Sequence, residues 1–309
     1  MKVAFFTEAG SKRGMGHLIR CQTIATELKR NDVEVDFFLD SDIDYRYIFD
    51  DLQYFEWSNF ILQKTYDVIF IDSYEANLLI YKLISKSTKI PIYIDDYERL
   101  PYPKGIIINF APNAKEIFFK NKHNSCLLGI DYIPIREIFF KHQKNIKYKK
   151  IFIMLGGSDT ANLSQDILES LKEINIKKVI VINNESTKNT LKKYQNIEIL
   201  FKPNDEELIY QMSSSSYAIS TASMTLYELA FLRIPTVIIA VSKNQLLGVS
   251  QMINNNLATA YIDITKDNWK ISINREIKRL IKSRIELNQK IDGLGTKRIY
   301  DYIIKRLEK

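Results

Sequence analysis

Short runs dominated by Ile, Val and Phe recur from one end of the chain to the other, and amphipathic segments separate them. The runs are nearly continuous in apolar residues, which is typical of strands that are buried on both faces. We therefore expect strands at Val3–Phe6, Val33–Phe38, Val68–Ile71, Pro91–Ile94, Ile106–Asn109, Ile151–Leu155, Val179–Ile182, Ile197–Phe201, Tyr217–Ser220, Thr236–Ala240 and Ala258–Ile262.

The segments between these runs have helical periodicity. After the first run, one apolar helix face is formed by Leu18, Cys21, Ile24, Ala25 and Leu28. Later segments with such a pattern are Asn162–Lys172, Asp205–Ser213, Leu226–Leu232 and Gln245–Asn255. Strands that alternate with helices predict parallel sheets with helices on both faces, so the expected fold class is α/β.

The length and one polar stretch predict two domains. A chain of 309 residues is long enough for about two domains. The basic segment 141–150 leads directly into a new strand and a Gly-rich turn, so we place the boundary there. We expect two Rossmann-like, doubly wound domains, 1–145 and 150–290, and a closing helix within 291–309. Two such domains would face a cleft at the carboxyl ends of their strands, where open α/β sheets bind ligands.

Composition narrows the class of protein. Apolar residues make up 46% and charged residues 26% of the chain, which excludes a disordered protein. No apolar stretch is long enough for a membrane span, and the first residues predict a strand rather than a signal peptide. The net charge of +7 comes from lysines scattered over expected helix faces, so we expect no nucleic-acid partner. Cys21 and Cys126 suit neither a disulfide framework nor a metal site, which favours the cytoplasm.

The first candidate for chemistry is the loop that follows the first strand. It contains Gly14 and Gly16, which let backbone approach a ligand closely, and His17 at the start of a helix. A histidine titrates near neutral pH, so His17 is suited to act as a general base. The alternative is a helix-capping histidine in an ordinary turn. The spacing of the glycines does not match the dinucleotide-binding fingerprint.

The expected second domain carries three further candidates. Gly156, Gly157 and Ser158 follow its first strand and would hold a phosphate or a base, although a tight turn alone would explain them. Hydroxyl residues precede the helix at 226–232, and free N–H groups there would bind a diphosphate. The candidate contacts in that segment are Ser223, Met224, Thr225 and Glu228.

Two simpler explanations stand beside these candidates. Thr225 and Glu228 have the spacing of a capping box, which needs no ligand, whereas as a binding residue Glu228 would accept both ribose hydroxyls. Asn244 and Gln245 follow a later strand and would contact phosphate or sugar, or else form a plain loop with a helix cap.

Acidic residues at strand ends give weaker signals. Asp40, Asp42 and Asp44 alternate, but they lack the Gly and the distal Glu of a calcium loop, so we expect a solvated loop and no metal. The pair Asp95–Asp96 favours a turn cap over a ligand site. Asp72 and Tyr74 end another strand and are candidate substrate contacts.

At these residues the sequence resembles the UDP-2,4-diacetamido-2,4,6-trideoxy-β-L-altropyranose hydrolases of pseudaminic acid biosynthesis, which have the GT-B fold. The resembling blocks occur in family order across nearly the whole chain, and several also suit related glycosyltransferases. They are GMGHLIRC (14–21), IDSY (71–74), IDDYERL (94–100), LLGIDYIPIREIF (127–139), LGGSD (155–159), STASMTLYELAFLRIP (220–235), KNQ (243–245) and DGLGTKRI (292–299).

The resemblance implies a role for several residues. The family's water-activating histidine falls on His17, and a tyrosine of its sugar pocket falls on Tyr74. Its nucleotide-binding glycines, diphosphate-binding hydroxyls and ribose-binding glutamate fall on Gly156, Gly157, Ser223, Thr225 and Glu228. The chain departs from the family at Thr7 and Glu8, where an Arg and an Asp are usual, and at Glu75, where a Gly is common.

Three classes of function follow from this resemblance. The first is a hydrolase of a UDP-linked 2,4-diacetamido-2,4,6-trideoxyhexose, in which one base suffices because UDP is a good leaving group and helix N-termini stabilise it. Water attacking opposite UDP inverts C1, and neither a metal nor another cofactor is required. The second is a GT-B glycosyltransferase that uses the same donor site. The third is a protein that binds a nucleotide sugar without turnover.

Overall fold

The chain forms two compact units in a computed structural model that describes residues 1–120, 125–142, 149–156, 159, 161–241, 246–283, 285, 287–288 and 290–308. Unit 1 consists of Met1–Ile135 together with the C-terminal segment Gly293–Lys309, and unit 2 is Arg136–Asp292. The chain therefore passes into the second unit at Ile135/Arg136, ahead of the basic segment 141–150 that suggested the boundary from sequence.

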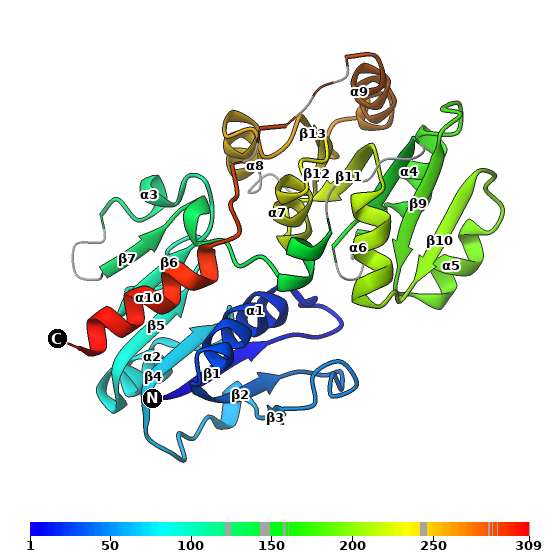
Figure 1. Ribbon diagram of the computed structural model, residues 1–309. Helices are drawn as coiled ribbons and strands as arrows, with labels where there is room; N and C mark the ends of the chain where they lie inside the picture. Colours follow the sequence, from blue (N-terminus) through cyan, green and yellow to red (C-terminus); the bar gives the residue numbers. More distant parts are fainter. Residues whose placement is uncertain are drawn as a thin grey trace. The chain divides into compact units, whose positions relative to one another are not determined.

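Unit 1 is built on a parallel sheet of seven strands in the order β3-β2-β1-β4-β5-β6-β7 (Figure 1). Its strands are β1 (Lys2–Glu8), β2 (Glu34–Asp40), β3 (Leu52–Tyr54), β4 (Tyr66–Asp72), β5 (Thr88–Ile94), β6 (Ile106–Asn109) and β7 (Ser125–Leu128). Its helices are α1 (Gly16–Arg30), α2 (Leu78–Ser87), α3 (Ala114–Ile117) and α10 (Gly295–Leu307), with the 3₁₀ turns η1 (Trp57–Asn59) and η2 (Ile130–Tyr132).

Aromatic side chains link the central strands of unit 1. Phe5 on β1 is paired in register with Phe37 on β2 and with Phe70 on β4. Its ring stacks on both, with centroids 5.5 Å and 4.3 Å away, and all three side chains are fully buried. On the other face of the sheet, α2 contributes Ile80 and Tyr81 to a separate core. Burial on both faces explains why these strands read as continuous apolar runs.

The C-terminal helix belongs to unit 1, where it packs on α1 and on η2 (Figure 1). Ile299 and Ile303, two residues of its expected apolar face, are fully buried. The helix approaches η2 so closely that a Cβ atom at Gly295 would lie 2.2 Å from the Ile133 carbonyl oxygen. Arg298 then donates a hydrogen bond of 2.9 Å to the carbonyl of Asp131. The expected closing helix is thus part of the first unit rather than a separate segment.

Unit 2 contains a parallel sheet of six strands in the order β10-β9-β8-β11-β12-β13. Its strands are β8 (Lys150–Met154), β9 (Lys177–Ile182), β10 (Ile197–Phe201), β11 (Tyr217–Thr221), β12 (Thr236–Ala240) and β13 (Ala260–Asp263). Its helices are the 3₁₀ turn η3 (Glu137–Lys141), α4 (Ser164–Ser170), α5 (Glu185–Leu191), α6 (Asp205–Ser213), α7 (Met224–Phe231), α8 (Leu246–Asn254) and α9 (Trp269–Ser283).

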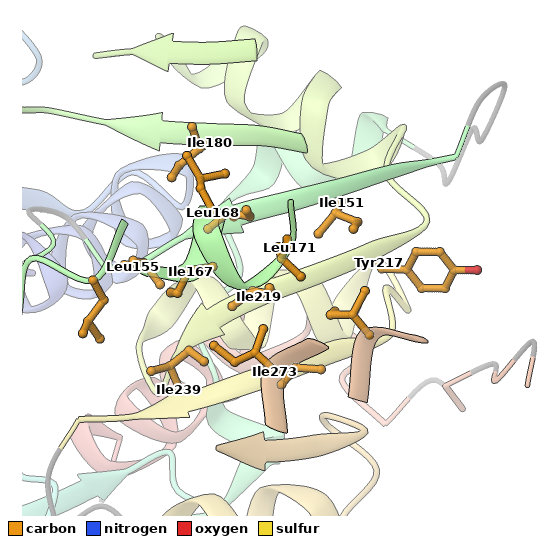
Figure 2. Packing of buried hydrophobic residues seen from close by; sticks show 14 of the residues in the cluster. Ile151, Leu155, Ile167, Leu168, Leu171, Ile180, Tyr217, Ile219, Ile239 and Ile273 are labelled. Atoms are coloured by element: carbon orange, nitrogen blue, oxygen red, sulfur yellow. The ribbon is translucent and has the colours of Figure 1, made fainter. Parts of the chain in front are cut away.

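The core of unit 2 is almost wholly aliphatic, in contrast to the aromatic centre of unit 1. Figure 2 shows Ile151, Ile219 and Ile239 from three neighbouring strands meeting Leu168 of α4 and Ile273 of α9. The helix α9 was not expected from the sequence, yet it closes this core. Across the described residues of both units, no helix is long and apolar enough to cross a membrane.

The entry of the chain into unit 2 explains why the boundary lies before the basic segment. Phe139 on η3 is fully buried, and the ring of Phe140 contacts that of Phe231 on α7. Arg136 at the start of this segment is bonded to side chains of α6 and α7. These apolar and ionic contacts attach residues 136–141 to unit 2, although their sequence precedes the polar stretch.

Candidate active site

The loop of His17 and the end of β4 meet at the switch point of unit 1. In the strand order of this sheet, β1 and β4 are neighbours, and the order reverses between them. Ligands of doubly wound sheets bind at this point, beyond the carboxyl ends of the strands. His17 lies just after β1, at the start of α1, and Asp72 is the last residue of β4. The topology therefore brings together two residues that are far apart in the sequence.

A small closed loop prepares the start of α1. Gly10 and Gly14 exchange two backbone hydrogen bonds of 3.1 and 2.8 Å, and Gly14 has a φ of 71°, which a residue with a side chain rarely adopts. Arg13 in this loop donates to Asp40 at 2.9 Å, and Ser11 donates its backbone N–H to Asp42 at 2.9 Å. These two aspartates of the Asp40–Asp44 segment therefore hold the loop in place.

His17 is paired with a buried carboxylate. Its Nδ1 lies 2.6 Å from Oδ1 of Asp72, and the Asp72 side chain is completely buried. An ionised carboxylate only accepts hydrogen bonds, so His17 donates through Nδ1–H and its Nε2 keeps a free lone pair. The His17 side chain itself is 10% exposed. This arrangement leaves His17 able to accept a proton at Nε2, as a general base requires.

The Asp72 carboxylate, a candidate substrate contact by its sequence, is bonded to protein groups. Arg20 donates to both of its oxygens, from Nε and Nη2, at 2.6 Å each. Burial by itself raises the pKa of Asp72, but the Arg20 charge and His17 outweigh it and hold the pKa well below its usual range. The buried carboxylate therefore has a fixed orientation, in which Oδ1 faces Nδ1 of His17.

Tyr74 is the exposed partner of this pair. Its ring meets the His17 ring edge-on, with centroids 4.5 Å apart, and the residue is 44% exposed. Its hydroxyl donates to Asp96, which also accepts from Arg20 at 2.9 Å. Tyr74 is thus placed beside His17. Asp96 was expected to cap a turn, but its neighbour Asp95 does so, accepting from the backbone N–H of Arg99 at 2.8 Å.

Two of the three positions that depart from the family pattern have structural partners here. Thr7 is fully buried, and its hydroxyl donates to the backbone carbonyl of Asp72 at 3.1 Å. Glu8 is 1% exposed and accepts from the Trp57 indole N–H and from the backbone N–H of Tyr74, at 2.9 Å each. Both residues therefore support the end of β4 and the loop that carries Tyr74.

Unit 2 has its own switch point, between β8 and β11. Gly156 follows β8 with a φ of 72°, and a Cβ atom there would lie 3.6 Å from Oγ1 of Thr221 at the end of β11. Glycine therefore allows the required backbone conformation at this point. Four expected contacts of this unit, Gly157, Ser158, Asn244 and Gln245, lie outside the described residues.

The start of α7 does not contain the capping box that was weighed as an alternative. Ser223, not Thr225, is the N-cap residue, and its side chain makes no capping bond. The Ser223 oxygen is buried without a hydrogen-bond partner, and the Thr225 hydroxyl contacts only the Met154 sulfur, at 3.7 Å. Met224 is the first residue of the helix. The Ser223 hydroxyl is thus left without a partner among the described residues, at the N-terminal end of a helix whose first N–H groups have no bond to a preceding turn of the helix.

Glu228 lies one turn into α7, where Arg136 pairs with it. The carboxylate is 6% exposed, and its Oε1 accepts from Arg136 Nε at 2.8 Å. Burial raises the pKa of Glu228, and the charge of Arg136 opposes that rise. Arg136 also donates to Asp205 at 2.5 Å. An ion pair with Arg136, rather than a helix cap, is therefore the structural partner of Glu228.

A metal site requires a particular arrangement of metal-ligating side chains. No group of three His, Cys, Asp or Glu side chains in the described ranges is arranged to hold a metal ion. The spacing of Asp40, Asp42 and Asp44 could suggest a metal loop. Their carboxylates instead accept hydrogen bonds from neighbouring groups, as Asp44 does from Arg46.

Sequence comparison finds relatives along most of the chain, although no family model matches it. Over 252 residues, 80% of this chain, it is 27% identical to a Helicobacter pylori protein named pseudaminic acid cytidylyltransferase and UDP-2,4-diacetamido-2,4,6-trideoxy-β-L-altropyranose hydrolase. Over 263 residues, 79% of this chain, it is 28% identical to the Campylobacter jejuni UDP-2,4-diacetamido-2,4,6-trideoxy-β-L-altropyranose hydrolase. The matched regions are 46% of the first relative, so the chain spans about half its length, and 93% of the second. The resemblance predicted from the motifs is confirmed.

Solved structures share the architecture at low sequence identity. The S. aureus MnaA–UDP structure matches with a TM-score of 0.66 at 12% identity, over 99% of this chain and 97% of that one. MurG of Acinetobacter baumannii matches with a TM-score of 0.64 at 13% identity, over 99% and 100% of the two chains. The UDP-GlcNAc 2-epimerase of Methanocaldococcus jannaschii matches with a TM-score of 0.63 at 11% identity, over the same shares. This chain has the GT-B fold.

Three charged residues near the two switch points were not predicted from the sequence as site residues. Arg20 stands three positions after His17 on the expected helix, and that spacing alone places both on one helix face. Asp96 was considered only as a turn residue. Arg136 lies near the end of an apolar run, and no local pattern connects it with Glu228, which follows 92 positions later.

Proposed function

We propose that this protein hydrolyses a UDP-linked 2,4-diacetamido-2,4,6-trideoxyhexose to UDP and the free sugar, in a pathway of the pseudaminic acid type. The observation that carries the proposal is the His17–Asp72 pair, with a 2.6 Å contact at Nδ1 and a free Nε2, at the switch point of unit 1. The relatives named above support the substrate class, because their names specify this hydrolase activity.

The proposed reaction needs one base and a stabilised leaving group. Water gives a proton to Nε2 of His17 while its oxygen attacks C1 of the sugar. The bond between C1 and the diphosphate oxygen breaks, and its electron pair leaves with UDP. Attack opposite the departing UDP inverts the configuration at C1. Because UDP is already a good leaving group, no second carboxylate has to protonate it.

Unit 2 is the proposed nucleotide-binding half. Gly156 leaves room for the nucleotide at the end of β8, while Ser223, Thr225 and the N-terminus of α7 would hold the diphosphate. Glu228 would accept hydrogen bonds from the ribose hydroxyls. The role of Ser223 is supported by its hydroxyl oxygen, which is buried with no hydrogen-bond partner. The role of Glu228 is supported by its ion pair with Arg136, which fixes the carboxylate through Oε1.

We assign the sugar-binding role to unit 1, in which Tyr74 lies beside His17. Gly16 supports this, because an added Cβ atom there would meet nothing within 4 Å, so the fold itself does not require a glycine at that position. A reaction of this kind takes place where nucleotide sugars are made, and the cytoplasm remains the predicted location.

The decisive experiment incubates the purified protein with UDP-2,4-diacetamido-2,4,6-trideoxy-β-L-altropyranose in ¹⁸O-labelled water. We expect release of UDP without any acceptor, with the label on C1 of the sugar and none on UDP. Proton NMR of the first product should show the inverted anomer. Label on the diphosphate would mean cleavage of the P–O bond and would contradict the proposed role of His17.

The same assay separates the other two classes of function. UDP release that depends on an added acceptor would indicate a glycosyltransferase that uses the same donor. Binding of the UDP-sugar without turnover, under conditions in which the Campylobacter jejuni relative is active, would indicate a protein that only binds nucleotide sugars.

A further inference from the structure

Five side chains form a closed ring of contacts around the presumed base. Asp72 accepts from His17 Nδ1 and from two nitrogens of Arg20, at 2.6 Å in each case. Arg20 also donates to Asp96, from Nη1 at 2.9 Å and from Nη2 at 3.2 Å. Asp96 accepts from the Tyr74 hydroxyl, and the Tyr74 ring returns to the His17 ring at 4.5 Å. We call these five residues the Arg20 network.

Arg20 is the one arginine of the Arg20 network, and the resemblance stated from the sequence assigns no role to it. It is 8% exposed in its side chain and sits one helical turn after His17. We propose that Arg20 is the positioning residue that fixes the Asp72 carboxylate and, through it, holds the His17 ring with Nε2 available to the attacking water. This inference rests on the proposed function of His17 and adds a residue that acts on the reaction only through it.

The central place of Arg20 in the network gives the first reason. The polar groups around the imidazole are Asp72 from β4, Tyr74 and Asp96 from the loops after β4 and β5, and Arg20 from α1 itself. Arg20 donates to both aspartates, and its Nη2 lies 3.2 Å from His17 Nδ1. Removing its guanidinium would therefore release Asp72 and Asp96 together.

The geometry of the guanidinium gives the second reason. Its planar fork holds the Asp72 carboxylate through two parallel bonds, so the carboxylate has one fixed orientation and Nδ1 of His17 has one partner. Its remaining N–H groups bind Asp96, which in turn fixes the Tyr74 hydroxyl. The ring of Tyr74 then restricts rotation of the His17 ring. A lysine at this position would keep the charge but not the two-point contact.

The first test follows the imidazole directly and needs no substrate. The chain has only three histidines, so ¹⁵N-histidine spectra of the free protein are easily assigned with single His variants. We expect wild-type His17 to carry its proton on Nδ1 when neutral. In Arg20→Gln and in Arg20→Lys this preference for the Nδ1–H tautomer should weaken, because neither side chain holds the Asp72 carboxylate at two points.

Arg30 provides the matched control. It stands on the same helix, and its guanidinium is paired with Glu27 at 3.6 Å, 45% exposed. Arg30→Gln should leave the His17 tautomer unchanged. A wild-type tautomer preference in a folded Arg20→Gln protein would overturn the proposal. If Arg20→Gln does not fold, the Lys variant still tests the proposal through its spectra and its kinetics.

The second test is kinetic and asks whether Arg20 acts through His17. Arg20→Lys should lower kcat about five- to twentyfold with KM changed less than twofold, because a point charge cannot fix Asp72 as the fork does. In a His17→Ala background the same substitution should change kcat less than twofold. Full additivity of the two substitutions, or a wild-type kcat in Arg20→Lys, would overturn the proposal.

The two tests distinguish failure of this proposal from failure of the proposed function. If the wild-type protein turns over no UDP-sugar, the proposed function fails, while the histidine NMR spectra still report on Arg20. If the wild type is active and His17→Ala is inactive, but the Arg20 variants behave like the wild type in both tests, the function stands and the role of Arg20 is wrong.

Discussion

The two switch points of this protein have the same topology and opposite chemistry. In unit 1, between β1 and β4, buried charges converge on a single histidine, and Arg20 binds Asp72 and Asp96 together. In unit 2, between β8 and β11, small residues, hydroxyls and backbone N–H groups prevail, with Glu228 and its partner Arg136 one turn further on. In the proposed function, one sheet end moves a proton, and the other holds a diphosphate and a ribose.

The difference teaches how one strand order serves two tasks. A proton acceptor needs its orientation and charge fixed by partners, and in unit 1 these come from β4, β5 and α1. A diphosphate needs free N–H groups and little side-chain bulk, and in unit 2 the N-terminus of α7 supplies them. We therefore expect changes in unit 1 to affect turnover and changes in unit 2 to affect nucleotide affinity.

The largest expected effect is that of His17→Ala. Loss of a positioned base should lower kcat about 10²- to 10⁴-fold, which corresponds to about 3–5 kcal/mol, because water must then attack unassisted. Affinity for UDP, measured by calorimetry, should stay within about twofold, since the proposed nucleotide contacts belong to unit 2. His17→Asn should be equally inactive, and His142→Ala is the control that should keep full activity. More than about a tenth of wild-type turnover in His17→Ala would make the residue structural and remove the contrast between the units.

The next effect concerns Glu228. Glu228→Gln should weaken UDP binding about tenfold or more, because the neutral amide accepts weaker hydrogen bonds from ribose, worth about 1.5–3 kcal/mol. The preference for UDP over 2′-deoxy-UDP should shrink in parallel. The matched control is Glu207→Gln, which removes the charge from the real capping box that Glu207 forms with Asn204 on α6. That control should lower Tm slightly and leave UDP affinity unchanged. A lower Tm with unaltered UDP affinity in Glu228→Gln would return that residue to a purely structural role.

Lowering the pH should reduce the unfolding free energy of unit 1 more than that of unit 2. Lys89 and the Lys2 backbone lower the pKa of Asp67, and the charge of Arg20 lowers those of Asp72 and Asp96 against the opposing effect of burial. Groups with a depressed pKa stabilise the fold above their unfolded value near 4, and this contribution is lost as the pH falls through the folded pKa. Asp95 in the same unit has a raised pKa and opposes this trend, and in unit 2 burial raises the pKa of Glu228. The sign there is reversed, so acid does not remove stability through Glu228.

The two tryptophans make this prediction measurable, because Trp57 lies in unit 1 and Trp269 in unit 2. Urea unfolding of Trp269→Phe follows unit 1, and that of Trp57→Phe follows unit 2. Between pH 6 and pH 3, unit 1 should lose about 2 kcal/mol of unfolding free energy more than unit 2. Equal losses in both units would contradict the assignment of the acid-sensitive charges to unit 1.

The smallest expected effect is that of chelation. Helix N-termini and hydroxyls of unit 2 are expected to bind the diphosphate without a bridging ion. Activity should therefore change less than about twofold in excess EDTA. A complete loss that magnesium restores would show that unit 2 does not hold the diphosphate by its own groups, and the comparison between the units would have to be redrawn.

Much of the frame was predictable because local pattern and burial agree. The strands Ile197–Phe201 and Thr236–Ala240 and the helix Asp205–Ser213 were predicted with the bounds that the structure has. The short strands β3 and β7 and the helices α2, α5 and α9 were not. Leu52–Tyr54 has only three residues, too few for any periodicity, and α9 is rich in charged residues that obscure its apolar face.

The candidate site divides in the same way. Sequence by itself determined the glycine loop, His17 at a helix start and the hydroxyls before α7, because each is a local pattern with a local physical cause. Only the tertiary structure decided that Asp72 is a buried partner of His17, that Arg20 joins it to Asp96, and that Arg136 rather than a capping box holds Glu228. Those pairs are separated by 55, 76 and 92 positions. A contact across such distances arises from the order of the strands and the fold of each unit, and short-range periodicity carries no record of it.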